Sequence, residues 1–308
     1  MTNRKITLLS VCAALLAICI IQGIFGAIDP VKTIKTDASP DEITITAAGE
    51  TIELSIKNNL WYVGNDGYLA NKADVDSMIK ALQQIKVLDK VGRFGTVLDE
   101  RYELSDEKAK TVTAKKAGKE IASIKIGKTS STGSQTYALV NGKGDILLLS
   151  GNLSSTFGKS AVDLRSKTVY TVDEKNVQSA TVTMGAKTWG IENSAKAGEK
   201  NNWVFTGTNP GFELDQDLAQ AWIQNVCFLN INSWISDSTP LPANKLTSFQ
   251  LVTKSGETIF VDIYEKKDGD NTQYIGTSSA TAHKFDLTKY LTEKFTKNCE
   301  DLKVKAEK

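Results

Sequence analysis

The stretch from Ile43 to Leu88, ITITAAGETIELSIKNNLWYVGNDGYLANKADVDSMIKALQQIKVL, contains the pattern that decides the predicted fold. Apolar and polar residues alternate over residues 43–45 and 52–56, on either side of Gly49, and this alternation predicts a β-hairpin. Trp61 follows, and apolar residues then recur at the spacing of one helix face. They are Val75, Met78, Ile79, Leu82 and Ile85. The stretch predicts antiparallel strands followed by an amphipathic helix.

The same order of features recurs in the second half of the chain, where Trp203 stands in the place of Trp61. Asn71 and Asp215 lie where each helix would be capped. The second apolar face consists of Leu218, Trp222, Val226 and Leu229, and the matching turns are Ala117-Gly118-Lys119 and Ser255-Gly256-Glu257. This agreement predicts an α+β fold of two repeated units, residues 41–172 and 173–308, each an antiparallel sheet with helices on one face.

The N-terminal residues 1–28 predict a cytoplasmic tip and a transmembrane helix. Arg4 and Lys5 precede Ile6 to Ile28, which contains no charged residue. At about 1.5 Å per residue, this run is long enough for a hydrocarbon core of about 30 Å. The positive charges on the short side place the N-terminus in the cytoplasm and the remainder outside. A cleaved signal peptide is the alternative, and residues 29–40 are expected to form a spacer.

Composition and ligand counts exclude several classes of function. The chain has 37 Lys plus Arg against 36 Asp plus Glu, a net charge of +1, so no nucleic-acid partner is expected. Cys227 and Cys299 are the cysteines outside the apolar run, and His283 is the single histidine. These residues lack the spacing of a metal site, so neither a metal nor a cofactor is predicted. A Cys227–Cys299 disulfide is allowed outside the cytoplasm, and two separately buried thiols are the alternative.

No catalytic residues are predicted, and we expect a protein that is not an enzyme. His283 has Asp286 nearby in sequence but no nucleophile, so an exposed or sheet-edge histidine is favoured. The tryptophans could stack sugars if they shared an exposed face. We expect packing roles for Trp61, Trp203 and Trp222. Trp234 is the expected exposed ring and the candidate ligand or partner contact.

Several short segments resemble a known family in their order and spacing. They are Arg101-Tyr102-Glu103-Leu104-Ser105, Ile124-Lys125-Ile126-Gly127, the strand at Tyr137, and Asp163-Leu164-Arg165-Ser166-Lys167. Together with the N-terminal run and the Trp61 region, they resemble the DUF4340 family, a bacterial family of unknown biochemical function. Glu103 and Ser105 depart from the Gly and Asp usual in that family. The resemblance implies a role beside ABC-type export components, which members are often encoded next to, and it carries over no catalytic residue.

Two functions are expected from these observations. The first is a single-pass membrane protein with an extracytoplasmic C-terminal part, which serves as a non-enzymatic accessory or interaction module of an envelope ABC-type transport system. The alternative is an envelope ligand-binding domain for glycan or peptide, with its site in the cleft between the two units. Trp234 precedes Pro240-Leu241-Pro242, where the second unit is expected to carry an insertion.

Overall fold

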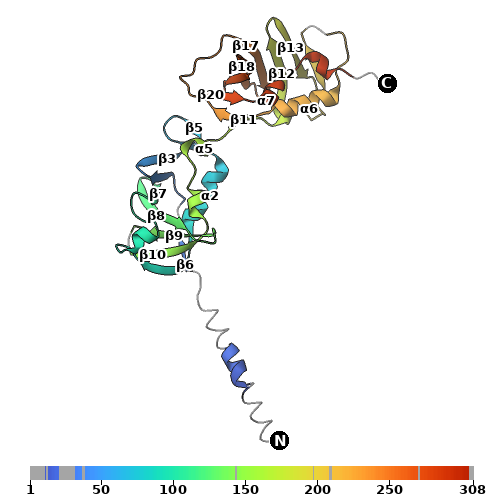
Figure 1. Cartoon of the computed structure of the whole chain (residues 1–308). Helices are drawn as coiled ribbons and strands as arrows, with labels where there is room; N and C mark the ends of the chain where they lie inside the picture. Colours follow the sequence, from blue (N-terminus) through green and yellow to red (C-terminus); the bar gives the residue numbers. More distant parts are fainter. Residues whose placement is uncertain are drawn as a thin grey trace, which may run out of the picture. The chain divides into compact units, whose positions relative to one another are not determined.

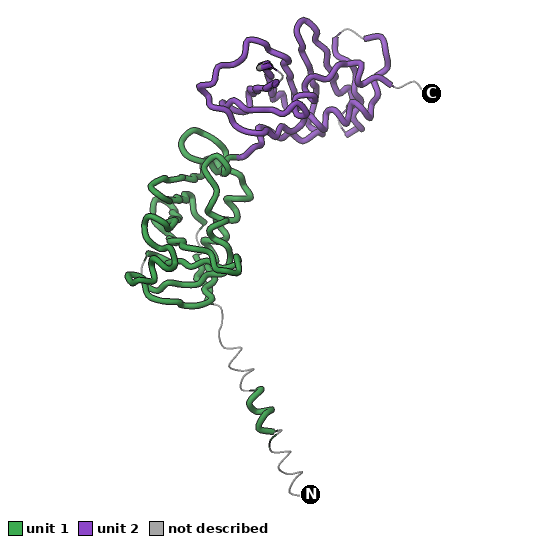
Figure 2. The backbone as a smooth tube through the Cα atoms, in the orientation of Figure 1, with its two compact units in different colours: residues 1–165 green, residues 166–308 purple. Residues whose placement is uncertain are grey.

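The computed structural model describes residues 11, 13–20, 32–36, 39–142, 144–196, 198–207, 210–269 and 271–304. The chain divides into two compact units, residues 1–165 (unit 1) and 166–308 (unit 2), as Figures 1 and 2 show. The boundary predicted from the sequence lies after residue 172.

Unit 1 is built on a ten-stranded antiparallel sheet with the order β1-β6-β10-β9-β8-β7-β2-β3-β4-β5. Its strands are β1 (Lys32–Lys35), β2 (Glu42–Ala47), β3 (Glu50–Lys57), β4 (Leu60–Val63), β5 (Tyr68–Leu69), β6 (Gln84–Arg93), β7 (Lys110–Lys116), β8 (Lys119–Thr129), β9 (Gln135–Val140) and β10 (Asp145–Ser150). The predicted hairpin is β2–β3, in which Ile43 faces Leu54 and Ile45 faces Ile52. Alternation thus puts Ile43, Ile45 and Leu54 into the core.

One long helix packs its apolar face against the core of unit 1. Helix α2 (Lys72–Gln83) begins at Asn71, whose side chain accepts hydrogen bonds from the Ala73 and Asp74 amides. Its buried residues are Val75, Met78 and Leu82. Ile85, expected on the helix face, is buried in β6 instead. The short helices are α3 (Leu98–Arg101), α4 (Leu153–Thr156) and α5 (Ala161–Leu164).

Unit 2 is built on an eight-stranded antiparallel sheet with the order β14-β13-β12-β17-β18-β19-β20-β16. Its strands are β12 (Val177–Met184), β13 (Lys187–Asn193), β14 (Trp203–Thr206), β16 (Ser233–Trp234), β17 (Lys245–Thr253), β18 (Thr258–Asp268), β19 (Asn271–Ser278) and β20 (Thr281–Leu287). Strands β11 (Thr168–Thr171) and β15 (Phe228–Asn230) form a separate pair. The helices are η1 (Glu174–Asn176), α6 (Gln216–Val226), α7 (Lys289–Glu293) and η2 (Cys299–Leu302).

The strand order of unit 2 repeats that of unit 1. Reading β6-β10-β9-β8-β7-β2-β3-β4 in unit 1 against β16-β20-β19-β18-β17-β12-β13-β14 in unit 2 gives the same succession along the chain. Trp61 in β4 and Trp203 in β14 each lie in the strand before the long helix. The β7–β8 and β17–β18 turns carry Gly118 (φ 76°) and Gly256 (φ 88°), in the left-handed region that favours glycine. The repeat predicted from hydrophobic spacing is therefore present in the sheet topology.

The predicted α+β class is wrong, because the protein is mostly β. Helices α2 and α6 have 12 and 11 residues, and the other named helices have three to five. The prediction assigned too few residues to the sheets. The apolar residues after α2 form β6, which pairs with both β1 and β10, and residues 32–35, assigned to a spacer, form β1.

The predicted transmembrane helix over Ile6 to Ile28 is not supported. Residues 1–10, 12 and 21–31 lie outside the described residues. Among the described residues, no helix combines the length and the apolar character needed to cross a membrane.

Candidate functional site

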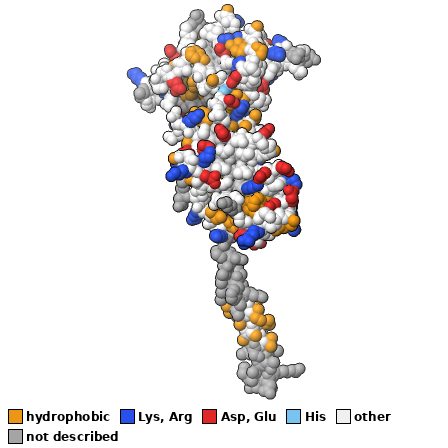
Figure 3. All heavy atoms as spheres, turned by 90° about the vertical axis from the view of Figure 1, so that its left-hand side faces the viewer, with side chains coloured by type: hydrophobic (Ala, Val, Ile, Leu, Met, Phe, Trp, Pro, Cys, Tyr) orange, Lys and Arg blue, Asp and Glu red, His pale blue; other side chains and the backbone are white. Residues whose placement is uncertain are grey.

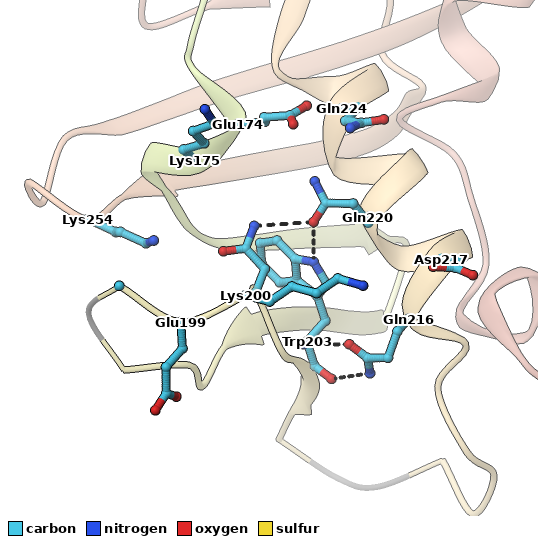
Figure 4. A pocket seen from close by; sticks show the side chains of 12 residues that line it. Glu174, Lys175, Glu199, Lys200, Trp203, Gln216, Asp217, Gln220, Gln224 and Lys254 are labelled. Atoms are coloured by element: carbon cyan, nitrogen blue, oxygen red, sulfur yellow. Dashed lines mark hydrogen bonds between the residues drawn. The ribbon is translucent and has the colours of Figure 1, made fainter.

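A polar pocket of about 540 Å³ lies beside α6 in unit 2 (Figure 4). Five segments form its walls: η1, the connection between β13 and β14, the start of β14, α6, and the turn after β17. The lining residues are Glu174, Lys175, Gly198, Glu199, Lys200, Asn201, Trp203, Gln216, Asp217, Gln220, Gln224 and Lys254. We call this cavity the α6 pocket.

Three glutamines of α6 form one wall of the α6 pocket. Gln216, Gln220 and Gln224 recur every four residues, so they project from one helix face. The buried face of the helix consists of Ala219, Trp222, Ile223 and Val226. The amide wall is therefore the polar side of the same amphipathic helix whose apolar side packs into the core. This four-residue spacing of glutamines is visible in the sequence, where it is the signal for a polar helix face.

A chain of hydrogen bonds fixes Gln220 in the wall of the pocket (Figure 4). The Gln220 Oε1 accepts from the Trp203 indole Nε1 at 2.9 Å and from the Asn201 Nδ2 at 3.2 Å. Asn193 Nδ2 in turn donates to Asn201 Oδ1 at 2.7 Å. With two donors on its oxygen, the amide orientation is determined. The Gln220 Nε2 makes no hydrogen bond within the described part of the chain, so its two N–H groups are available to a ligand.

Gln216 closes the edge of the sheet next to the pocket. Its Oε1 accepts from the Trp203 backbone N–H at 2.9 Å, and its Nε2 donates to the Trp203 carbonyl at 2.8 Å. The side-chain amide thus satisfies edge-strand groups of β14 in the way that a neighbouring strand would. Trp203 itself is 1% exposed. Its ring packs behind the pocket wall and has no exposed face on which a ligand ring could stack.

Charges of both signs surround the pocket. Its lining contains three lysines, Lys175, Lys200 and Lys254, and three carboxylates, Glu174, Glu199 and Asp217. The Lys175, Lys200 and Lys254 side chains make no hydrogen bond or ion pair with any described residue. Their charges sum to zero with those of the carboxylates. This arrangement suits a ligand rich in hydroxyl or amide groups more than one with a high net charge.

The α6 pocket belongs to one copy of the repeat. The β3–β4 connection of unit 1 is residues 58–59, whereas the β13–β14 connection of unit 2 is residues 194–202 and supplies Glu199, Lys200 and Asn201 to the pocket. On α2, counted from its cap, Lys72 and Asp76 occupy the positions of Gln216 and Gln220, and their side chains form an ion pair at 2.6 Å. The amide wall is therefore absent from the described residues of unit 1.

His283 lies elsewhere in unit 2 and pairs with Asp237, not with the predicted neighbour Asp286. Of the two expectations for His283, an exposed or a sheet-edge residue, the exposed one is wrong, because the residue is 7% exposed. It lies in β20, the strand next to the end strand β16. Its Nδ1 lies 2.9 Å from Asp237 Oδ2, whereas Asp286 accepts a hydrogen bond from Asn232. The hydrogen bond with His283 holds the pKa of Asp237 below its usual value.

Trp234 packs beside this histidine and is partly buried. Its ring centroid lies 5.8 Å from that of His283 in an edge-on arrangement, and its indole N–H donates to the Ser166 carbonyl at 2.8 Å. The expectation of a freely exposed ring is therefore wrong. Trp234 does not line the α6 pocket, and its role as a ligand or partner contact stays a prediction.

The two cysteines of unit 2 are separate free thiols. Cys227 is buried at the C-terminal end of α6 and Cys299 is half-buried in η2. Burial, reinforced by the nearby Glu174 and Asp173 carboxylates, raises the pKa of the Cys227 thiol to about 11. In the part of the chain that the structure describes, no three His, Cys, Asp or Glu side chains are placed to hold a metal ion.

Two antiparallel sheets of the same strand order, each with one long amphipathic helix inserted between its strands, define a mostly β protein of tandem repeated units. Residues 61–249 match the family model "Domain of unknown function (DUF4340)". The match runs from β4 of unit 1 to β17 of unit 2 and covers more than half of the chain, so the protein belongs to the DUF4340 family. No curated protein and no solved structure matches the chain.

Proposed function

We propose that this protein is a non-enzymatic binding module of the cell envelope that holds a small polar ligand, a glycan or peptide fragment, in the α6 pocket. The observation that carries the proposal is the fixed orientation of Gln220. Its oxygen is held by Trp203 and Asn201, and its Nε2 is left free. A donor that is already oriented costs little conformational entropy when a ligand binds.

The size and chemistry of the pocket support this ligand class. A volume of about 540 Å³ lies within the range of about 300–1,000 Å³ typical of small-molecule sites. The side-chain amide of Gln224 offers both donors and an acceptor, which is what hydroxyl and peptide groups require. The burial of Trp203 speaks against recognition of a sugar by ring stacking, so glycan and peptide fragments would both be held by hydrogen bonds.

The substitution Gln220→Glu provides the test. Glutamate keeps an oxygen acceptor for Trp203 and Asn201 but removes the free Nε2 donors, so the fold should survive while binding is lost. Cell-wall glycan and peptide fragments are screened by thermal shift, and each hit is titrated by calorimetry. We expect an affinity loss of about tenfold or more, the equivalent of a charge-assisted or buried hydrogen bond. Gln273→Glu, on the exposed part of β19, is the matched control.

Two results would contradict the proposal. One is a screen in which no fragment changes the melting temperature at millimolar concentration. The other is a hit whose affinity is the same for the wild type, Gln220→Glu and Gln273→Glu, because such a ligand would bind away from the α6 pocket.

We also propose that the protein works outside the cytoplasm, beside ABC-type transport components. The uncharged run after Arg4 and Lys5 supports export of the two units. The partner is proposed only because the family resemblance implies a role beside ABC-type export components. The described side chains on the face shown in Figure 3 mix both charge signs, as the net charge of +1 leads one to expect.

Protease accessibility in spheroplasts tests the location, and crosslinking followed by mass spectrometry tests the partner. Digestion of the C-terminal part by added protease and crosslinks to an ABC permease are expected. A C-terminal part that stays protected while a known extracytoplasmic protein is digested would refute the location. Crosslinks that are absent from the permease but present on unrelated proteins would refute the partner.

A further inference from the structure

A second cavity in unit 2, of about 300 Å³, lies where α6 and α7 meet. The two helices lie side by side in Figure 1, and residues of both line the cavity. We call it the α6–α7 groove. Its lining residues are Leu218, Ala221, Trp222, Asn225, Phe228, Tyr290, Leu291, Glu293, Lys294 and Lys297. None of them lines the α6 pocket.

Lys294 provides a positive charge with an unused hydrogen-bond donor in this groove. Its Nζ donates to the Asn225 carbonyl at 3.1 Å and to the Phe228 carbonyl at 2.6 Å, which caps the C-terminal end of α6. An ammonium group has three N–H donors. The third makes no hydrogen bond to any described residue. Burial lowers the pKa of Lys294 to about 8.

Exposed aromatic side chains line the same groove. The ring of Phe228 is centred 4.8 Å from Lys294 Nζ, and that residue is 43% exposed. Tyr290 is 81% exposed. Helix capping explains two of the donors of Lys294, but it does not require large rings to remain in water beside it. Lys294 and Lys297 against Glu293 leave the groove with an excess of one positive charge when Lys294 is protonated.

We propose that the α6–α7 groove binds an amphipathic carboxylate, a molecule with an apolar body of several carbon atoms that ends in one carboxylate group. The carboxylate accepts the third N–H of Lys294, and the apolar body covers the exposed faces of Phe228 and Tyr290. The excess positive charge of the groove favours an anion. The negative C-terminal end of α6 would disfavour an anion, but Lys294 offsets it. A volume of about 300 Å³ limits the apolar body to a short chain or a single ring.

Octanoate and octan-1-ol, titrated into the full chain by calorimetry, test the proposal. Both have the same apolar chain, so their difference isolates the carboxylate. We expect octanoate to bind about tenfold or more tightly than octan-1-ol, as a charge-assisted hydrogen bond provides. Lys294→Met should remove this preference, while Lys289→Met, at an exposed lysine of α7, should keep it. Tyr290→Ser, which removes an exposed ring without disturbing the core, should weaken binding of both probes.

The pH dependence and a peptide pair complete the test. The affinity for octanoate should fall as the pH rises above about 8, since Lys294 then loses its proton. The other titratable groups around it are Cys227 from α6, whose pKa is raised to about 11, and Tyr290, Glu293 and Lys297 of its own segment. A short peptide ending in leucine carboxylate, compared with its C-terminal amide, shows whether a peptide end can supply the same chemistry.

Equal affinities for octanoate and octan-1-ol would overturn the proposal. So would an octanoate affinity that is unchanged in both Lys294→Met and Tyr290→Ser. If Lys294→Met does not fold, Tyr290→Ser and the pH series decide the matter alone. A preference for the leucine carboxylate peptide over octanoate would assign the groove to peptide ends and still support the carboxylate.

Discussion

Leu82→Ala should destabilise unit 1 by about 2 to 5 kcal/mol. Leu82 is 1% exposed and lies on the face of α2 that packs into the core with Val75 and Met78. The substitution removes buried carbon atoms at about 0.8 kcal/mol per methylene equivalent, and the cavity that remains adds to this loss. Leucine and alanine are both good helix formers, so the change in helix propensity is small. The expected magnitude therefore reflects packing.

Urea titration read by hydrogen exchange and mass spectrometry provides the measurement, because peptides from β2, β3 and α2 report on unit 1 separately. A single unfolding curve for a chain of two units would not define one free energy. The matched control is Leu60→Ala in β4, because Leu60 is 51% exposed. We expect it to cost less than about 1 kcal/mol. Equal losses for the two variants would refute the assignment of Leu82 to a filled core.

Two further predictions concern unit 2. Gly276→Ala should lower the melting temperature, because an added Cβ would lie 2.1 Å from Cε2 of Phe285, its cross-strand partner; an unchanged melting temperature would show that the ring can move aside. Asp237→Asn should lower stability at neutral pH, and the difference from wild type should shrink as the pH falls below 3.8. The reason is that the folded-state pKa of Asp237 is depressed, so its contribution is complete above that value and is lost at lower pH. A difference that stays constant in urea melts from pH 7 to pH 2 would contradict the role of the pair with His283.

The hairpins and the repeat could be predicted because their signals are local. Alternation of apolar residues on both sides of a turn glycine, as at Gly118 and Gly256, determines which neighbouring strands pair and which face is buried. Two copies of such a pattern reinforce each other. The class was missed because the pairing of β6 with β1 and β10 joins segments distant in the sequence. Only the packed sheet shows that Ile85 continues as a strand after α2.

The surroundings of single residues were harder to predict for the same reason. The partner of His283 is Asp237, which is 46 residues away, and the indole of Trp234 reaches Ser166, which is 68 residues away. No periodicity connects such pairs. The sequence therefore shows that a histidine or a tryptophan is present, but it does not show how exposed the side chain is. The burial of His283 and the partial burial of Trp234 both involve such long-range contacts.

The α6 pocket shows how a repeat can provide a scaffold without repeating a site. The strand order and the long helix are common to both units, so these parts follow from folding alone. What differs is the connection over residues 194–202 and the polar face of the helix, where Gln220 stands in place of the ion-paired Asp76. Neither change touches the apolar residues that hold the helix on its sheet. A ligand site can be built from residues that differ between the two copies without altering the core. Here those residues lie in unit 2, so unit 2 is the copy to test for binding.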